Sequence, residues 1–177
     1  GDFDIAAINN DHTSQIFEND GTGHYTELIT ANISTSGIYP LESQFEDFDN
    51  DGFIDLIITG SDDYIYYKNN GNKTFTRVDS LFSTNGIVSF ATGDLNHDGF
   101  IDVYASLGDI YNNPSPDFDD IMYLNNGNKV NHFITFDLEG TVSNNDAIGT
   151  NVVIYGAWGM QRREVRSGES YGTCNSS

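Results

Sequence analysis

Short apolar runs separated by polar turns dominate the first two-thirds of this 177-residue chain. Three of them, at residues 5–8, 56–59 and 103–106, are β-prone, and each directly follows a polar segment that ends in Asp. Runs of about four to eight apolar residues bounded by turn residues are typical of buried strands. Helical periodicity is absent from the sequence, so the pattern predicts an all-β protein.

A turn signal follows each of these runs. The three segments are FENDGTGHY at 17–25, YKNNGNKTF at 67–75 and YLNNGNKVN at 123–131. Asn-Gly or Asp-Gly between β-prone flanks predicts a hairpin, because the turn needs backbone conformations with positive φ that these residues tolerate. The third turn lies farther from its apolar run than the other two, which predicts an inserted loop at 109–120.

An acidic segment recurs along the chain. DFDNDGFID at 47–55 returns as DLNHDGFID at 94–102, and GDFD at 1–4 reads as the tail of a further copy. A period of about 50 residues that contains several short strands fits one four-stranded blade of a β-propeller. Two complete repeats and a tail are fewer than the roughly four to eight blades of a closed ring. We therefore expect a partial β-propeller, with the rest of its own longer chain or a neighbouring chain at the open blade edges.

Acidic side chains far outnumber basic ones, with 27 Asp and Glu against 7 Lys and Arg and a net charge of −20. This charge repels nucleic acid and anionic membrane surfaces, so we expect neither as a partner. No apolar run approaches the roughly 18–20 residues of a membrane span, so we expect no direct membrane insertion. Residues 1–130 hold 22 acidic and 4 basic side chains, whereas residues 131–177 hold 5 and 3, which predicts a boundary near 130.

The repeated segment has the pattern D-x-[DN]-x-D-G-x-x-D, with oxygen-bearing side chains at positions 1, 3, 5 and 9. Ca²⁺ prefers several oxygen ligands, and Gly at position 6 permits the sharp bend that turns them inward. Carboxylates so close together repel one another unless a cation neutralises them. An EF-hand would need Glu at position 12, where the two copies have Ile58 and Ala105. The sequence therefore predicts calcium sites in β-hairpin loops, and magnesium fits this ligand set less well.

Candidate ligands come from the two complete copies and the tail. They are the side chains of Asp47, Asp49, Asp51 and Asp55 with the carbonyl of Phe53, the side chains of Asp94, Asn96, Asp98 and Asp102 with the carbonyl of Phe100, and Asp4 of the partial copy. The alternative is a set of solvated acidic turns without metal, but two copies in register favour the metal. Calcium affinities of about 0.1–1 mM are typical of extracellular modules, which indicates a secreted or cell-surface protein.

These motifs resemble a known family. DFDNDGFIDL with YKNNGNKTF, and DLNHDGFIDV with YLNNGNKVN, are similar to FG-GAP/VCBS repeats, the integrin α-type propeller blade with a calcium loop between its strands. NHFITFDLEG, SNNDAIGTNV and REVRSGESY resemble the ASPIC/UnbV domain, which follows such repeats in the cartilage acidic protein-like family. The resemblance implies FG-GAP/VCBS blades over 1–130 and an ASPIC/UnbV-like β segment over 131–177, which we expect to be truncated.

The C-terminal part also reads as β structure without the resemblance. Alternation and β-branched residues predict three strands, at 133–138, 152–155 and 160–166. Arg162, Arg163 and Arg166 belong to the last of these strands. We expect them to pair with Glu164 and the acidic propeller rather than to form an anion-binding patch.

The predicted function is non-catalytic. No His-Glu-x-x-His motif surrounds any histidine, and the Asp residues are better explained as metal ligands than as general acids. We expect a calcium-binding extracellular scaffold for protein or glycan binding or adhesion, with Tyr111, Asp117 and Asp119 of loop 109–120 as candidate contacts. The same loop is equally consistent with an insertion that has no binding role. The alternative function is an accessory propeller of a secreted polysaccharide-acting enzyme.

Overall fold

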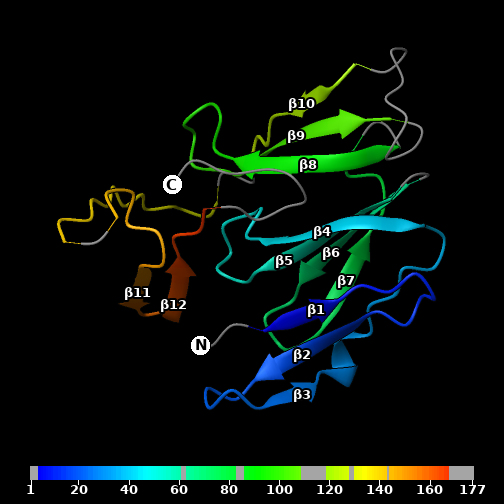
Figure 1. Cartoon of the computed structure of the whole chain (residues 1–177), viewed down its shortest axis with the longest axis horizontal. Coiled ribbons are helices and arrows are strands. Elements are labelled where there is room, and N and C mark those ends of the chain that lie inside the picture. The colour runs from blue at the N-terminus through cyan, green and yellow to red at the C-terminus, as the bar shows by residue number, and fades with distance from the viewer. Residues whose placement is uncertain are drawn as a thin grey trace.

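The computed structural model describes residues 4–60, 63–82, 86–108, 119–127, 130–142 and 144–167. Its strands form three stacked sheets and one separate hairpin, all of them antiparallel (Figure 1). These ranges contain no α-helix, and their one helical element is a short 3₁₀ turn, η1 (Ile29–Ala31). The all-β prediction is confirmed.

Each sheet is a meander in which strands pair with their neighbours along the chain. Sheet 1 has the order β1-β2-β3, with β1 (Ile5–Ala7), β2 (Gln15–Asn19) and β3 (Tyr25–Glu27). Sheet 2 has the order β4-β5-β6-β7, with β4 (Pro40–Glu46), β5 (Asp55–Gly60), β6 (Tyr64–Asn69) and β7 (Phe75–Val78). Sheet 3 has the order β10-β9-β8, with β8 (Ile87–Gly93), β9 (Asp102–Leu107) and β10 (Ile121–Tyr123). Sheet 2 is thus the four-stranded blade that the repeat predicted.

Strand β5 lies between two apolar cores. Leu56 and Ile58 pack with residues of sheet 1, whereas Ile57 packs with residues of sheet 3. Neighbouring side chains of a strand point to opposite faces, and all three are fully buried. Each such side chain contributes about 1.5–3 kcal/mol when it is buried. A strand covered on both faces needs consecutive apolar residues, which explains why the run at 56–59 does not alternate.

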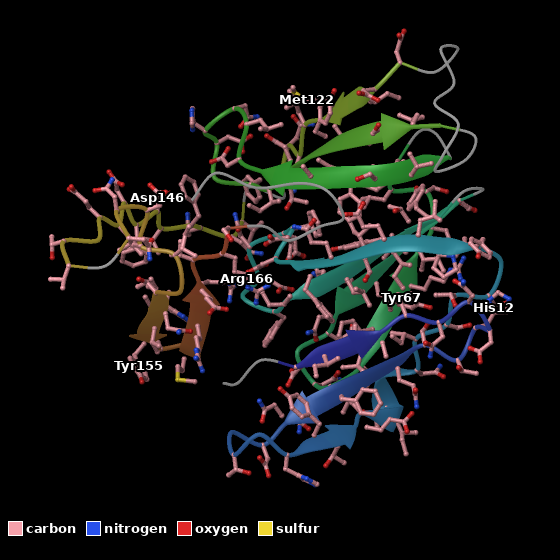
Figure 2. The ribbon with its side chains drawn as sticks, viewed as in Figure 1. His12, Tyr67, Met122, Asp146, Tyr155 and Arg166 are labelled. Carbon is pink, nitrogen blue, oxygen red and sulfur yellow. The ribbon has the colours of Figure 1, made fainter. Side chains whose placement is uncertain are left out.

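Strand β6 continues the same arrangement with aromatic residues. Tyr67 packs in the core toward sheet 1, where its hydroxyl donates to the Ser34 carbonyl at 2.8 Å and accepts from the Ser34 amide at 2.9 Å. Tyr66 packs in the core toward sheet 3, with its ring edge-on to Phe48. Figure 2 shows Tyr67 in the interior, in contrast to Met122 and Tyr155 on the outside.

Buried polar side chains join sheet 2 to sheet 3. The Glu42 carboxylate on β4 accepts a hydrogen bond from the Phe90 amide on β8 at 2.9 Å. The Gln44 side-chain amide donates to the Thr92 hydroxyl at 2.6 Å. Because Glu42 and Gln44 are buried, these bonds replace hydration that both groups lose on folding.

The C-terminal part confirms two of its three predicted strands. β11 (Asn151–Gly156) pairs with β12 (Gly159–Glu164) in the C-terminal hairpin, which lies beside the loop end of sheet 2 (Figure 1). The strand predicted at 133–138 is wrong, because this segment runs without strand pairing. Phe133, Ile134 and Phe136 are all exposed there. No strand of the described residues pairs with this segment, and isolated extended chain is not a stable strand.

The third turn also differs from its prediction. β10 ends at Tyr123, and the described part of 124–150 contains no strand, so YLNNGNKVN does not form a second hairpin strand as the other two turns do. Most of the predicted inserted loop, with Tyr111 and Asp117, lies outside the described residues. Asp119 is described and exposed. Over the described ranges, the protein has no helix long and apolar enough to cross a membrane.

Candidate metal centre

The two acidic segments form equivalent loops between neighbouring strands. Residues 47–54 connect β4 to β5, and residues 94–101 connect β8 to β9. Position 4 has positive φ in both loops, 56° at Asn50 and 60° at His97. Position 6 follows with φ of 93° at Gly52 and 85° at Gly99, a conformation that residues with a Cβ rarely adopt. The predicted β-hairpin loops without flanking helices are therefore present.

Backbone amides hold the acidic side chains in the same way in both loops. The Gly52 amide donates to Asp47 Oδ2 at 3.0 Å, and the Gly99 amide donates to Asp94 Oδ2 at 2.9 Å. The remaining equivalent bonds are Asp51 amide to Asp49 Oδ1, Phe53 amide to Asp51 Oδ1, Asp98 amide to Asn96 Oδ1 and Phe100 amide to Asp98 Oδ1, at 2.9–3.1 Å. Positions 1, 3 and 5 are thus oriented by the loop itself.

The first loop gathers three carboxylates. One oxygen each from Asp47, Asp49 and Asp51 lies within 4.8 Å of the others, the one such acidic group found in the described part of the chain. Oδ1 of Asp47 is buried and has no hydrogen-bond partner among the described residues. Burial raises the pKa of Asp47, and the nearby Arg163 opposes that rise. A buried carboxylate oxygen without a partner beside two more carboxylates fits a bound cation.

The second loop brings together fewer charges. Asp94 and Asp98 flank Asn96, whose side-chain amide donates to Asp98 Oδ2 at 3.0 Å. Asp94 is half-buried, but Asp98 is exposed. His97 is exposed as well, as expected for a side chain that points away from the loop. This loop therefore offers two carboxylates and one amide oxygen at the positions where the first loop has three carboxylates.

The last Asp of each acidic segment has a role that the sequence did not reveal. Asp55 and Asp102 are fully buried, and neither belongs to the three-carboxylate group. Each accepts a hydrogen bond from the backbone amide of the Asn that opens the following turn, Asn69 at 2.8 Å and Asn125 at 2.7 Å. Asp4, which is exposed, accepts the same bond from Asn19 at 2.9 Å, so all three copies share it.

The second oxygens of the two buried Asp side chains are also occupied. Oδ2 of Asp55 accepts from the Tyr66 hydroxyl at 2.6 Å, and Oδ2 of Asp102 accepts from the Leu95 amide at 2.9 Å. Burial raises the pKa of Asp55 to about 6, although the bonds from Tyr66 and Asn69 oppose the rise. The same burial and the Asp55 carboxylate raise the pKa of Tyr66. These carboxylates therefore connect each acidic loop to the turn that follows it.

Phe53 and Phe100, whose carbonyls are predicted ligands, pack their rings on the neighbouring turns. The Phe53 ring lies where a Cβ on Gly71 would be, and the Phe100 ring lies where a Cβ on Gly127 would be. Each acidic loop is thus packed against the Asn-Gly turn of its own sheet. This packing explains why the pattern DGF and the pattern NNG occur together in both repeats.

Two basic side chains enter the first loop, and sequence reasoning missed one of them. Lys68 Nζ on β6 forms ion pairs with Asp49 and, at 2.8 Å, with Asp51. Burial lowers the pKa of Lys68, but the bonds to both carboxylates outweigh it, and the net shift is upward. Arg163 on β12 pairs with Asp47 at 3.1 Å, and Arg166 pairs with Glu164 at 3.4 Å, so the predicted pairing with Glu164 and the acidic repeats is confirmed. The strand itself ends at Glu164, so Arg166 lies beyond the strand in which it was predicted.

Side-chain amides join the first loop to the second loop and to the segment that follows β10. Asn50 of the first loop donates to the Gly99 carbonyl of the second at 2.8 Å. Asn131 donates to the Asp49 carbonyl at 2.8 Å, and Asn125 donates to the Phe48 carbonyl at 2.7 Å. Both loops lie at one end of the stacked sheets (Figure 1), and the first loop also contacts the segment that follows β10.

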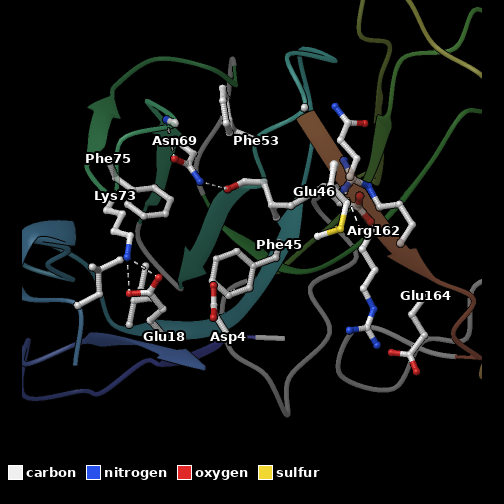
Figure 3. Close-up of a pocket in the computed structure, with 18 of the residues that line it drawn as sticks. Asp4, Glu18, Phe45, Glu46, Phe53, Asn69, Lys73, Phe75, Arg162 and Glu164 are labelled. Carbon is white, nitrogen blue, oxygen red and sulfur yellow. Dashed lines mark hydrogen bonds and ion pairs between the residues drawn. The ribbon is translucent and has the colours of Figure 1, made fainter. Parts of the chain in front are cut away.

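A cavity of about 460 Å³ lies between sheets 1 and 2 and the C-terminal hairpin (Figure 3). Its lining carries both signs of charge, and the Lys73 ammonium pairs with Glu18 at 2.5 Å within it. Arg162 and Glu164 of β12 line the cavity together with Glu46 of β4 (Figure 3). Charges of both signs in one open cavity do not select an anion or a cation.

One further segment bears on catalysis. GESYG at 168–172 matches the G-x-S-x-G pattern of serine hydrolases, and it lies outside the described residues. The pattern indicates a nucleophile only at a tight strand-to-helix turn with His and an acid nearby. The pattern alone therefore does not identify a nucleophile, and a non-catalytic protein stays a prediction.

The comparison with protein families decides what the repeats are. The model of the FG-GAP-like repeat matches residues 1–58 and 47–105, which together make up more than half of the chain. The chain belongs to the FG-GAP-like repeat family. Each matched FG-GAP-like stretch ends just after one of the two acidic loops, within β5 or β9. No curated protein and no solved structure matches the chain. The FG-GAP-like match stops before residue 131, so the resemblance of 131–177 to ASPIC/UnbV stays a prediction.

Proposed function

We propose that this protein is a calcium-binding propeller scaffold that works outside the cell. The observation that carries the proposal is the group of Asp47, Asp49 and Asp51 in a loop of an FG-GAP-like repeat. One buried oxygen of Asp47 has no hydrogen-bond partner in the part of the chain that the structure describes. In the second loop Asp94, Asn96 and Asp98 would hold an ion in the same way. A bound cation supplies positive charge that neutralises these carboxylates and ties each loop to its sheet.

The ligand set favours calcium over magnesium. Three or four oxygens from one loop suit the larger, flexible coordination shell of Ca²⁺, whereas Mg²⁺ retains several waters and uses fewer protein ligands. The loops lie at one end of a rigid stack of sheets, so ion binding needs little rearrangement of the backbone. Affinities of about 0.1–1 mM would fill such sites outside the cell and leave them empty in cytosol.

The scaffold would present surface loops to a protein or a glycan partner. Its sheets are held by two continuous cores, and a rigid scaffold is suited to positioning loops for binding. Asp119 is exposed, two residues before β10, and remains a candidate contact. In this proposal the protein carries out no reaction of its own.

Isothermal titration with calcium tests the proposal. We expect two binding events, of which Asp51→Ala removes one and Asp98→Ala removes the other, because each change deletes one carboxylate of one loop. Asp146→Ala is the matched control, since Asp146 is an exposed acid that belongs to neither loop (Figure 2). Absence of calcium binding to the unmodified protein, or equal loss in the Asp146 variant, would reject the proposal.

A further inference from the structure

The Lys68 ammonium contacts the acidic side chains of the first loop, as a bound metal cation would. It contacts one oxygen each of Asp49 and Asp51, and both oxygens belong to candidate ligands of the calcium site. The Lys68 side chain is about one-third exposed, so part of it lies at the surface. The third carboxylate of the group, Asp47, is paired with Arg163 from the C-terminal hairpin. Three negative charges thus face two positive charges supplied by the chain itself.

We propose that Lys68 is a tethered cation that occupies the first loop when no ion is bound and must withdraw when calcium enters. This inference rests on the calcium function proposed above. The Lys68 ammonium and Ca²⁺ cannot both contact Asp49 and Asp51 without strong repulsion, because even unit charges a few ångströms apart interact strongly in a partly hydrated site. Because the Lys68 side chain is partly exposed, its ammonium can move into solvent when it leaves the loop.

The repeats differ at this position. The residue before the Asn-Asn-Gly turn is Lys68 in the second sheet, but it is Leu124 in the third sheet. Leu124 is half exposed and carries no charge, so it cannot compete with an ion. By the number of carboxylates alone the first loop would bind calcium more tightly than the second. The tethered cation reduces that advantage and sets the affinity of the first loop.

Calcium titration of matched variants tests this inference. Each variant also carries Asp98→Ala, so that the first loop is the site that titrates. We expect Lys68→Leu to tighten calcium binding roughly three- to tenfold, because two partly exposed ion pairs no longer compete with the ion. Lys73→Leu removes the same charge from the same hairpin, but Lys73 pairs with Glu18 and does not touch the loop. It should change the affinity by less than about twofold.

Chemical reactivity of Lys68 gives a second readout that does not depend on affinity. An amine-acetylating reagent followed by peptide mass spectrometry should label Lys68 faster in calcium than in EGTA, because the ammonium leaves its two carboxylates. Lys73 serves as the internal reference and should react at the same rate in both conditions.

The outcomes separate the two claims. Calcium binding with no change in Lys68→Leu and no change in Lys68 labelling would overturn the tethered cation and leave the calcium function intact. Absence of calcium binding in every variant would reject both claims. Binding that becomes measurable only in Lys68→Leu would support the tethered cation in its strongest form.

Discussion

At the scale of single residues, Asp55 shows how burial and hydrogen bonding act on one carboxyl group. It is fully buried, and its oxygens accept bonds from the Asn69 amide and the Tyr66 hydroxyl. Burial nevertheless raises its pKa to about 6 from 3.8. The folded protein therefore retains this proton at a pH where the unfolded chain has lost it.

This shift predicts the pH dependence of stability in the absence of calcium. Between about pH 4 and pH 6 the folded state binds more protons than the unfolded state, so raising the pH destabilises the protein. Asp55→Asn keeps an acceptor for the Asn69 amide and removes the charge. In EGTA, its free energy of unfolding should rise relative to the unmodified protein by at most about 3 kcal/mol as pH goes from 4 to 7.

Denaturant unfolding at several pH values measures this difference. Asp146→Asn is the control, because an exposed carboxyl group changes its environment little on folding. A constant difference between Asp55→Asn and the unmodified protein from pH 4 to pH 7 would contradict the role assigned to burial.

The sequence revealed some residue roles and not others. Asp47, Asp49 and Asp51 could be predicted as a group, because their spacing within one loop already brings them together. The bonds of Asp55 and Asp102 to the next turn could not, since they join residues 14 and 23 positions apart. The ion pair between Lys68 and Asp49 depends on how β6 lies beside the loop. The pattern of apolar and polar residues along the sequence does not give the position of one strand relative to a loop.

At the scale of elements, β5 separates the two cores. Ile57 belongs to the core shared with sheet 3, and Ile58 belongs to the core shared with sheet 1. The apolar run at 56–59 predicted a buried strand, and the structure adds that both faces are used. The alternating segment at 133–138 failed as a strand because alternation describes one face and does not supply a pairing partner.

Substitutions on the two faces of β5 should have separate effects. Ile57→Ala and Ile58→Ala should each lower the free energy of unfolding by about 2–5 kcal/mol through the cavity left behind. Hydrogen exchange should rise in β8 and β9 for Ile57→Ala, and in β2 and β6 for Ile58→Ala, because each change weakens a different core. The same exchange pattern in both variants would contradict a two-core arrangement.

At the scale of the whole molecule, three sheets stack through apolar cores while their acidic loops gather at one end. Because the protein has a net charge of −20, gathering its acidic loops at one end costs free energy unless cations neutralise them. Lys68 and Arg163 offset part of the charge at the first loop, and calcium would offset it more fully. Repeat period and turn signals predicted the stacked sheets, and the arginines of the last strand predicted contact with the acidic repeats. Which acidic loop the C-terminal hairpin contacts became visible only in three dimensions.

Thermal unfolding in calcium and in excess EGTA tests the central claim most directly. With free calcium at about ten times the dissociation constant, two sites together add about 2.8 kcal/mol of stability, which corresponds to a rise of roughly 5–10 °C in Tm. Asp51→Ala and Asp98→Ala should each show about half of that rise. Equal melting temperatures in calcium and in EGTA for the unmodified protein and both variants would contradict calcium binding by these loops.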